Sequence, residues 1–130
     1  MNYSSTANGN GARSAIGAVI GLAIAAVDHF AFGGEVSPIV IVGLLFSAAA
    51  ASGMWWGGRA ALAVVALWIS LPLSHVVKRV LGWPDTLHPN TYASIFALAG
   101  FSVVVCALGL GGGVLLRRLV RSGATAARRS

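Results

Sequence analysis

Charged residues are scarce in this sequence. Asp, Glu, Lys and Arg together make up 9% of the 130 residues, whereas soluble domains carry about 25%. Hydrophobic residues make up 57%. A soluble fold of this size could not remove so much apolar surface from water, but a protein surrounded by lipid does not need to. The composition therefore excludes an ordinary soluble domain and predicts a single-domain integral membrane protein.

Cysteine is nearly absent as well. The chain has one cysteine, Cys106, so a disulfide cannot form within one molecule and a cysteine-based metal site is excluded. Cys106 lies in the middle of the last apolar block of the sequence. A lone cysteine in such surroundings is typically a small buried hydrophobe, and we predict that role here.

Acidic residues are rare too, and the chain is basic. Three Asp and Glu residues against nine Lys and Arg residues give a formal net charge of +6. In a soluble protein this charge would suggest nucleic-acid binding. Here the basic residues are spread over loops and tails, without a hydrophilic domain that could present a groove. We therefore predict no nucleic-acid partner, and we expect the arginines to contact anionic lipids of the bilayer.

Four apolar blocks are each long enough to cross the hydrocarbon core of a membrane, which takes roughly 20 helical residues. They cover approximately residues 14–32, 37–56, 59–78 and 91–116. Because a backbone in lipid must satisfy its own hydrogen bonds, we predict that each block is a helix. The connectors at 33–36 and 57–58 are short, which forces neighbouring helices to run antiparallel. The predicted fold class is all-α, an integral membrane bundle of four antiparallel transmembrane helices.

Positive charges are distributed unequally between the two ends of these blocks. Lys78 and Arg79 fall on one side, and the other seven basic residues fall on the opposite side: Arg13, Arg59, Arg117, Arg118, Arg121, Arg128 and Arg129. By the positive-inside rule, the arginine-rich side faces the cytoplasm. An even number of spans also requires both termini to lie on the same side. Both arguments predict cytoplasmic termini.

The two ends of the chain are polar and are predicted to lie outside the transmembrane domain at 14–116. Residues 1–13 are rich in Asn, Ser, Thr and Gly, a composition typical of disorder. Residues 117–130 form a basic cytoplasmic tail rich in Arg, Ala and Ser. The preference for Arg and Ala favours a bacterial source, so we expect a multi-pass protein of the bacterial inner membrane.

The first apolar block has a second interpretation, a cleaved signal peptide. It follows Arg13 and reaches Ala23-Ile24-Ala25, which is similar to a cleavage site. The apolar run nevertheless continues to Val27, and its glycines recur at helical spacing. We therefore favour a retained first span.

Small residues recur at helical spacing in several blocks. Gly17, Gly21 and Ala25 share one face of the first block with Asp28, and comparable rows occur at 43, 47 and 51 and at Gly109 and Gly113. Small residues let helix backbones approach each other in lipid, so these rows are predicted to be helix-packing faces. A contact between two copies of the chain is the alternative. The first row turns Asp28 toward the interior of the bundle.

Ionisable residues gather at the ends of the blocks opposite the arginine-rich side. The candidate polar cluster consists of Asp28, His29, His75, Lys78, Arg79, Asp85 and His88. An ionisable group within a span costs up to about 3 kcal/mol on insertion scales, so it is usually paired. The favoured interpretation is a cluster of ion pairs and hydrogen bonds in which Asp28 binds Lys78 or Arg79. Such a cluster would join the first helix to the third.

The same residue types are also found in three other kinds of site. A metal site would draw on the three His and two Asp, but no two His are four residues apart and two nearby cations oppose a divalent ion. A haem would use His29 and His75 as ligands. Proton or anion transport would use Asp28, His75 and Lys78. We predict no metal, no cofactor and no catalytic residue.

The sequence thus favours a non-enzymatic accessory or interaction subunit of a membrane complex. Its partner would be a larger membrane protein or a second copy of the chain. The connector between Trp83 and Tyr92, with two prolines and several hydrogen-bonding side chains, is a possible docking surface. The alternative is a small oligomeric transporter or channel coupled to protons or anions.

Overall fold

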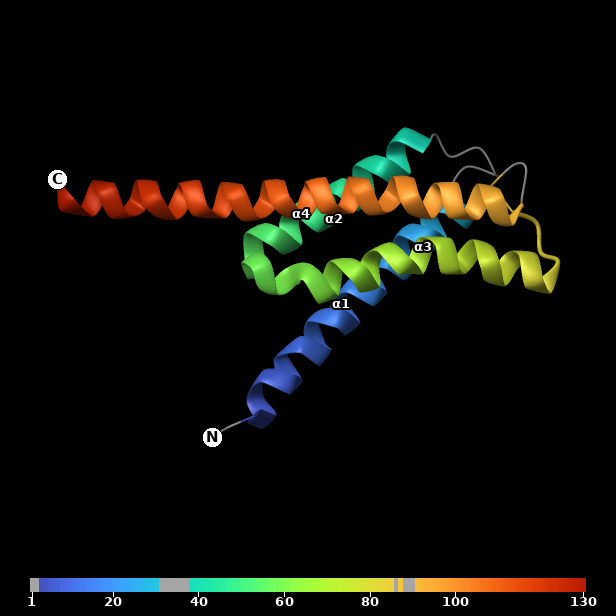
Figure 1. Cartoon of the computed structure of the whole chain (residues 1–130), viewed down its shortest axis with the longest axis horizontal. Helices are drawn as coiled ribbons and strands as arrows, with labels where there is room; N and C mark the ends of the chain where they lie inside the picture. Colours follow the sequence, from blue (N-terminus) through green and yellow to red (C-terminus); the bar gives the residue numbers. More distant parts are fainter. Residues whose placement is uncertain (1–2, 31–37, 86, 88–90) are drawn as a thin grey trace.

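A computed structural model describes residues 3–30, 38–85, 87 and 91–130 of the chain (Figure 1). These residues form the α-helices α1 (Tyr3–Phe30), α2 (Pro38–Trp56), α3 (Ala61–Leu81) and α4 (Tyr92–Arg129), with the 3-10 helix η1 (Gly57–Ala60) between α2 and α3. Within these ranges the chain has no strand. The predicted all-α class is therefore confirmed for the described part of the chain.

Three helical stretches are long and apolar enough to cross a membrane: Asn8–Phe30, Ile39–Leu81 and Tyr92–Arg129. The second stretch includes α2, η1 and α3, and Figure 1 shows that the chain reverses its direction at η1. The lengths and compositions of these stretches agree with the prediction of a membrane protein.

The reversal at η1 depends on Gly57. This residue has a φ of 63°, in the left-handed region that favours glycine. A Cβ atom at this position would also lie 2.8 Å from Nη1 of Arg117 on α4. The two-glycine connector predicted at 57–58 is thus a four-residue 3-10 turn that packs against α4.

The helices pack mainly in two pairs that are not neighbours in the sequence: α1 with α3, and α2 with α4. In the first pair, Gly17 and Gly21 lie against the backbone of α3. A Cβ on Gly17 would overlap the carbonyl group of Ala63, and one on Gly21 would lie 2.6 Å from the carbonyl oxygen of Leu67. Any side chain larger than hydrogen would separate these two helices.

The α2–α4 pair uses glycines from both helices. A Cβ on Gly113 of α4 would overlap the carbonyl group of Ala50, and one on Gly109 would lie 2.7 Å from the carbonyl oxygen of Phe46. On α2, a Cβ on Gly53 would lie 2.6 Å from the carbonyl oxygen of Leu110. Small residues therefore bring these two backbones into direct contact.

The small-residue row expected at 43, 47 and 51 of α2 is not a packing face, and that prediction was wrong. All three residues are exposed, and a Cβ on Gly43 would meet nothing within 4 Å. The buried face of α2 lies two residues along, about half a turn away, and carries Ile41, Leu45, Ala49 and Gly53. Because small residues occur on both sides of this helix, their spacing could not select the packed side.

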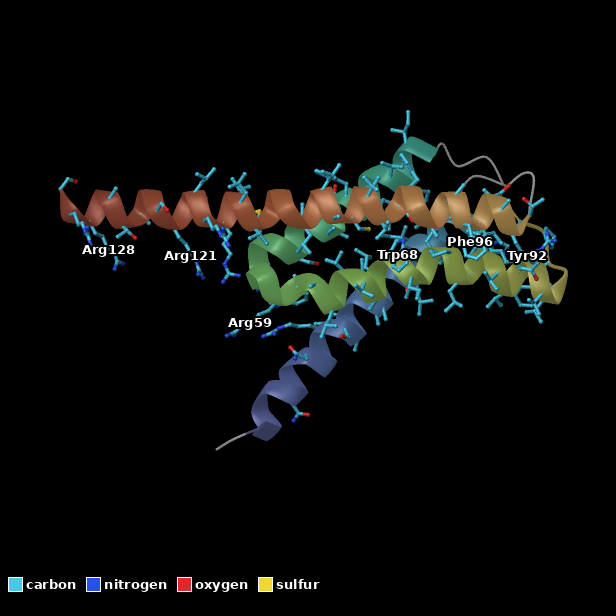
Figure 2. All side chains as sticks on the ribbon, viewed as in Figure 1. Arg59, Trp68, Tyr92, Phe96, Arg121 and Arg128 are labelled. Carbon is cyan, nitrogen blue, oxygen red and sulfur yellow. The ribbon has the colours of Figure 1, made fainter. Side chains whose placement is uncertain are left out.

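The core lies where the four helices meet and is made of aliphatic side chains. Leu45, Leu67 and Leu71 are buried there, and Cys106 is buried beside them, as expected for a small hydrophobe. Trp68 links α3 to α4: its indole Nε1–H donates to the carbonyl oxygen of Ala99 at 3.0 Å and to the Ser102 hydroxyl at 3.1 Å. Figure 2 shows Trp68, Phe96 and Tyr92 between these two helices.

Both ends of the chain are more helical than the composition suggested. Helix α1 already begins at Tyr3, within the segment 1–13 for which we expected disorder, and α4 continues through the expected tail to Arg129. Neither end contains a proline, and extending an existing helix costs far less than starting one. The connector at 33–36, Glu35 and His88 lie outside the described residues.

Candidate functional site

The end of α3 is shaped so that the chain turns back onto it. Gly82 has a φ of 66° and its N–H donates to the carbonyl oxygen of Arg79 at 3.3 Å. The N–H of Trp83 donates to the carbonyl oxygen of Lys78 at 2.9 Å. These two bonds are a Schellman motif, which ends a helix at a glycine and reverses the path of the backbone. The reversal carries Asp85 back toward the last turns of α3.

Asp85 meets His75 after this turn. Oδ1 of Asp85 lies 2.7 Å from Nδ1 of His75. An ionised carboxylate can only accept a hydrogen bond, so Nδ1 of His75 carries a proton in this contact. Nε2, on the opposite side of the ring, lies 3.8 Å from Oδ2 of Asp28 on α1. The imidazole of His75 therefore stands between two carboxylates from different parts of the chain.

Lys78 contacts the same two carboxylates. Its Nζ lies 3.4 Å from Oδ1 of Asp85 and 3.8 Å from Oδ2 of Asp28. Asp28, His75, Lys78 and Asp85 are hereafter the four-residue cluster. Two negative charges face one permanent positive charge, and a second proton on His75 would make the cluster neutral.

The four-residue cluster is largely removed from water. The exposed fraction of the side chain is 2% for Asp85, 4% for His75, 8% for Lys78 and 13% for Asp28. At such burial each charge loses its hydration and depends on its partners, so removing one partner is far more costly than at a surface.

Asp85 is the most deeply buried of the four. Burial by itself would raise the pKa of its carboxyl group, but the electrostatic influence of His75 and Lys78 and hydrogen bonds from His75 and the Leu87 N–H outweigh it. Together they hold the pKa of Asp85 below its ordinary value of 3.8. Asp85 is therefore ionised at neutral pH. Its second oxygen, Oδ2, is buried and has no hydrogen-bond partner among the described residues.

The other predicted site residues lie around the four-residue cluster or beyond the described part of the chain. Arg79 stacks over the ring of Tyr92 at 4.5 Å, a cation–π contact between α3 and α4. His29 lies edge-on to Phe30, with 4.6 Å between the ring centroids, and lines a cavity of about 370 Å³ between α1 and α3. His88 falls outside the described residues.

This arrangement bears on the alternatives raised by the sequence. Both ring nitrogens of His75 face carboxylates, which leaves neither of them directed at a haem iron shared with His29. Among the described residues, no three His, Cys, Asp or Glu side chains are grouped to hold a metal ion. The chemistry available to the four-residue cluster is proton binding and charge pairing between α1, α3 and the turn after α3.

Sequence reasoning missed the direct contact between Asp85 and His75. The two residues are ten positions apart, and no helical spacing relates them. The available signal was Gly82, because a glycine just after the last apolar residue of a helix often begins a Schellman turn. Of the two partners left open for Asp28, Lys78 and Arg79, the structure shows Lys78 in contact with it, at 3.8 Å.

Comparison with known proteins identifies no relative of this chain. The sequence matches no protein-family model, no curated protein and no solved structure at a significant level. The fold and the four-residue cluster therefore carry the functional argument alone.

Proposed function

We propose that this chain is a four-span protein of the bacterial inner membrane, with both termini in the cytoplasm, that serves as a non-enzymatic accessory subunit. Its α4 helix would bind a larger membrane protein. The observation that carries the proposal is the exposed apolar surface of α4 near and beyond the expected end of its span.

The length of α4 supports this assignment. At about 1.5 Å per residue, its 38 residues extend over roughly 57 Å, nearly twice the ~30 Å hydrocarbon core of a bilayer. Part of the helix must therefore stand outside the hydrocarbon. Figure 1 shows α4 continuing alone past η1 to the C-terminus. Every residue from Arg118 onward is exposed.

The projecting part of α4 has an apolar side that nothing in the described chain covers. Leu115, Leu116, Leu119 and Val120 are all exposed large hydrophobic residues. Leu119 and Val120 lie beyond residue 116, where the fourth span was expected to end. A partner helix that packs on this side would remove these side chains from water, which is the common mode of helix recognition.

The paired helices and the charge distribution support the four-span topology. Figure 1 shows the two termini and η1 toward one end of the molecule and the α3–α4 connection at the other. The arginine-rich side predicted to be cytoplasmic is the end with the termini. The test is labelling by a membrane-impermeant thiol reagent. We expect Trp83→Cys to react in intact cells and Ser130→Cys to react only after permeabilisation.

The accessory role is tested by isolating the chain from native membranes and measuring the stoichiometry of any complex. We expect a stoichiometric complex that Leu119→Ser with Val120→Ser disrupts. The matched control is Ala126→Ser with Ala127→Ser, which changes the same helix farther from the bundle and should leave the complex intact. A wild-type chain that is isolated alone, or equal losses in both variants, would contradict the proposed interface.

A second candidate, proton-coupled transport, is favoured by one observation. His75 lies between Asp85, which is 2.7 Å from Nδ1, and Asp28, which is 3.8 Å from Nε2. The ring would relay a proton between the two carboxylates once Asp28 moves within hydrogen-bond distance of Nε2. Purified chain in liposomes distinguishes the two functions. Proton flux that Asp28→Asn abolishes would establish transport and overturn the accessory role, whereas tight liposomes would reject transport.

A further inference from the structure

A basic cavity lies where α4 passes the α2–α3 turn, and its volume is about 520 Å³. Its lining comes from three elements and consists of Trp56, Gly57, Gly58, Arg59, Val114, Arg117, Arg118 and Arg121. Figure 2 shows Arg121 projecting from the side of α4 on which Arg59 and η1 lie. The size falls within the range of cavities that hold small molecules.

The positive charge of this cavity is not balanced by acidic residues in the described chain. Asp28 and Asp85, the acidic residues that the structure describes, both belong to the four-residue cluster near the other end of α3. Four guanidinium groups in one cavity repel each other, and a bound anion would remove that repulsion. The cavity therefore has the electrostatic character of an anion site.

Local geometry fixes one of the arginines of this cavity. Nη1 of Arg117 donates a hydrogen bond to the carbonyl oxygen of Trp55 at 3.1 Å. A guanidinium has five N–H donors, so Arg117 retains donors for a ligand. Gly57 leaves the room that this side chain needs, and a Cβ on Gly58 would meet nothing within 4 Å.

The lining combines apolar and charged side chains, as is typical of the membrane interface where lipid headgroups lie. Trp56 and Val114 contribute apolar surface, while Arg59, Arg118 and Arg121 are exposed. The neighbouring Trp55 is 80% exposed, and amphipathic aromatics of this kind concentrate at the membrane interface.

We propose that this cavity binds a phosphate-bearing anion through the guanidinium groups of Arg59, Arg118 and Arg121. Guanidinium and phosphate form paired, charge-assisted hydrogen bonds that an ammonium group cannot reproduce. The headgroup of an anionic phospholipid would place its phosphate in the cavity and its acyl chains along α2 and α4. Free phosphate offers the same chemistry. The lipid source depends on the membrane topology proposed above.

The test is a titration of the purified full chain in non-ionic detergent. The three probes are short-chain phosphatidylglycerol, phosphatidylcholine of the same chain length, and inorganic phosphate, with binding measured by calorimetry. We expect saturable binding of phosphatidylglycerol, weak binding of phosphatidylcholine, and a loss of about tenfold or more in phosphatidylglycerol affinity for Arg118→Gln with Arg121→Gln.

The control is Arg128→Gln with Arg129→Gln, which removes the same charge from the same helix away from the cavity. This variant should keep the wild-type affinity, and circular dichroism of both variants reports helix content. Equal losses in the two variants would overturn the site, because binding would then follow net charge alone. Saturable phosphate binding that only the cavity variant weakens would support the site, with free phosphate as its ligand.

Absence of saturable binding by every probe would also overturn the site. Labelling of Ser130→Cys separates this failure from a failure of the topology. If that residue is labelled from outside the cell, the topology is wrong, while binding of the probes in detergent still decides the anion site.

Discussion

Neutralising Asp85 should strongly destabilise the protein. Asp85→Asn preserves the shape of the side chain but removes the negative charge that lies 2.7 Å from His75 and 3.4 Å from Lys78. Breaking a buried ion pair from one side typically costs 3–5 kcal/mol. Lys78 keeps Asp28 at 3.8 Å, so we expect a loss near the lower limit of that range, about 3 kcal/mol.

The measurement is reversible unfolding by sodium dodecyl sulfate in mixed micelles, followed by circular dichroism. A double-mutant cycle with Lys78→Met isolates the interaction between the two charges. We expect a coupling free energy of about 1–3 kcal/mol between Asp85→Asn and Lys78→Met. If Asp85→Asn alone lowers the free energy of unfolding by less than about 0.5 kcal/mol, or if the two substitutions have additive effects, the contacts in the four-residue cluster do not stabilise the fold.

Three further predictions follow from particular contacts. The folded-state pKa of Asp85 lies below its ordinary value of 3.8. The stabilisation that ionised Asp85 gives should therefore be lost as the pH falls below that value, and the unfolding free energy of Asp85→Asn should depend less on pH in this range. Gly113→Ala should lower the free energy of unfolding by about 1–3 kcal/mol, because the added methyl group overlaps α2. Gly112→Ala should be neutral or stabilising in the same assay, because a Cβ at that position meets nothing within 4 Å. Trp68→Phe should cost about 1 kcal/mol through the lost hydrogen bonds to Ala99 and Ser102, and an unchanged unfolding free energy would contradict that link.

The helical character and approximate extent of the apolar segments could be predicted from the sequence. The predicted block at 37–56 corresponds to α2, and the block at 59–78 corresponds to α3, which continues to Leu81. This success has a physical basis, because long apolar runs in lipid must satisfy their backbone locally and only the helix does so within one segment. The polar ends lack this constraint. There the sequence predicts disorder at residues 1–13, whereas α1 already begins at Tyr3.

The candidate site could be predicted only in part. The small-residue row of α1 correctly placed Asp28 on the side that faces α3, because three spacings on one helix determine a direction. The same reasoning on α2 selected the exposed side, because that helix has small residues all around it. The sequence identifies Asp85 as a candidate, but its contact with His75 depends on the turn at Gly82 and on no repeating pattern.

By itself, the sequence determined that the chain is helical, rich in membrane-length apolar segments, and polarised between an arginine-rich end and an end with acidic and histidine residues. These properties follow from local hydropathy and from charge order along the chain. Only the tertiary structure decided that α1 pairs with α3 and α2 with α4, and that His75 stands between Asp28 and Asp85. Such pairings depend on which glycines meet which carbonyl groups, and that close fit between distant segments is a property of the packed helices.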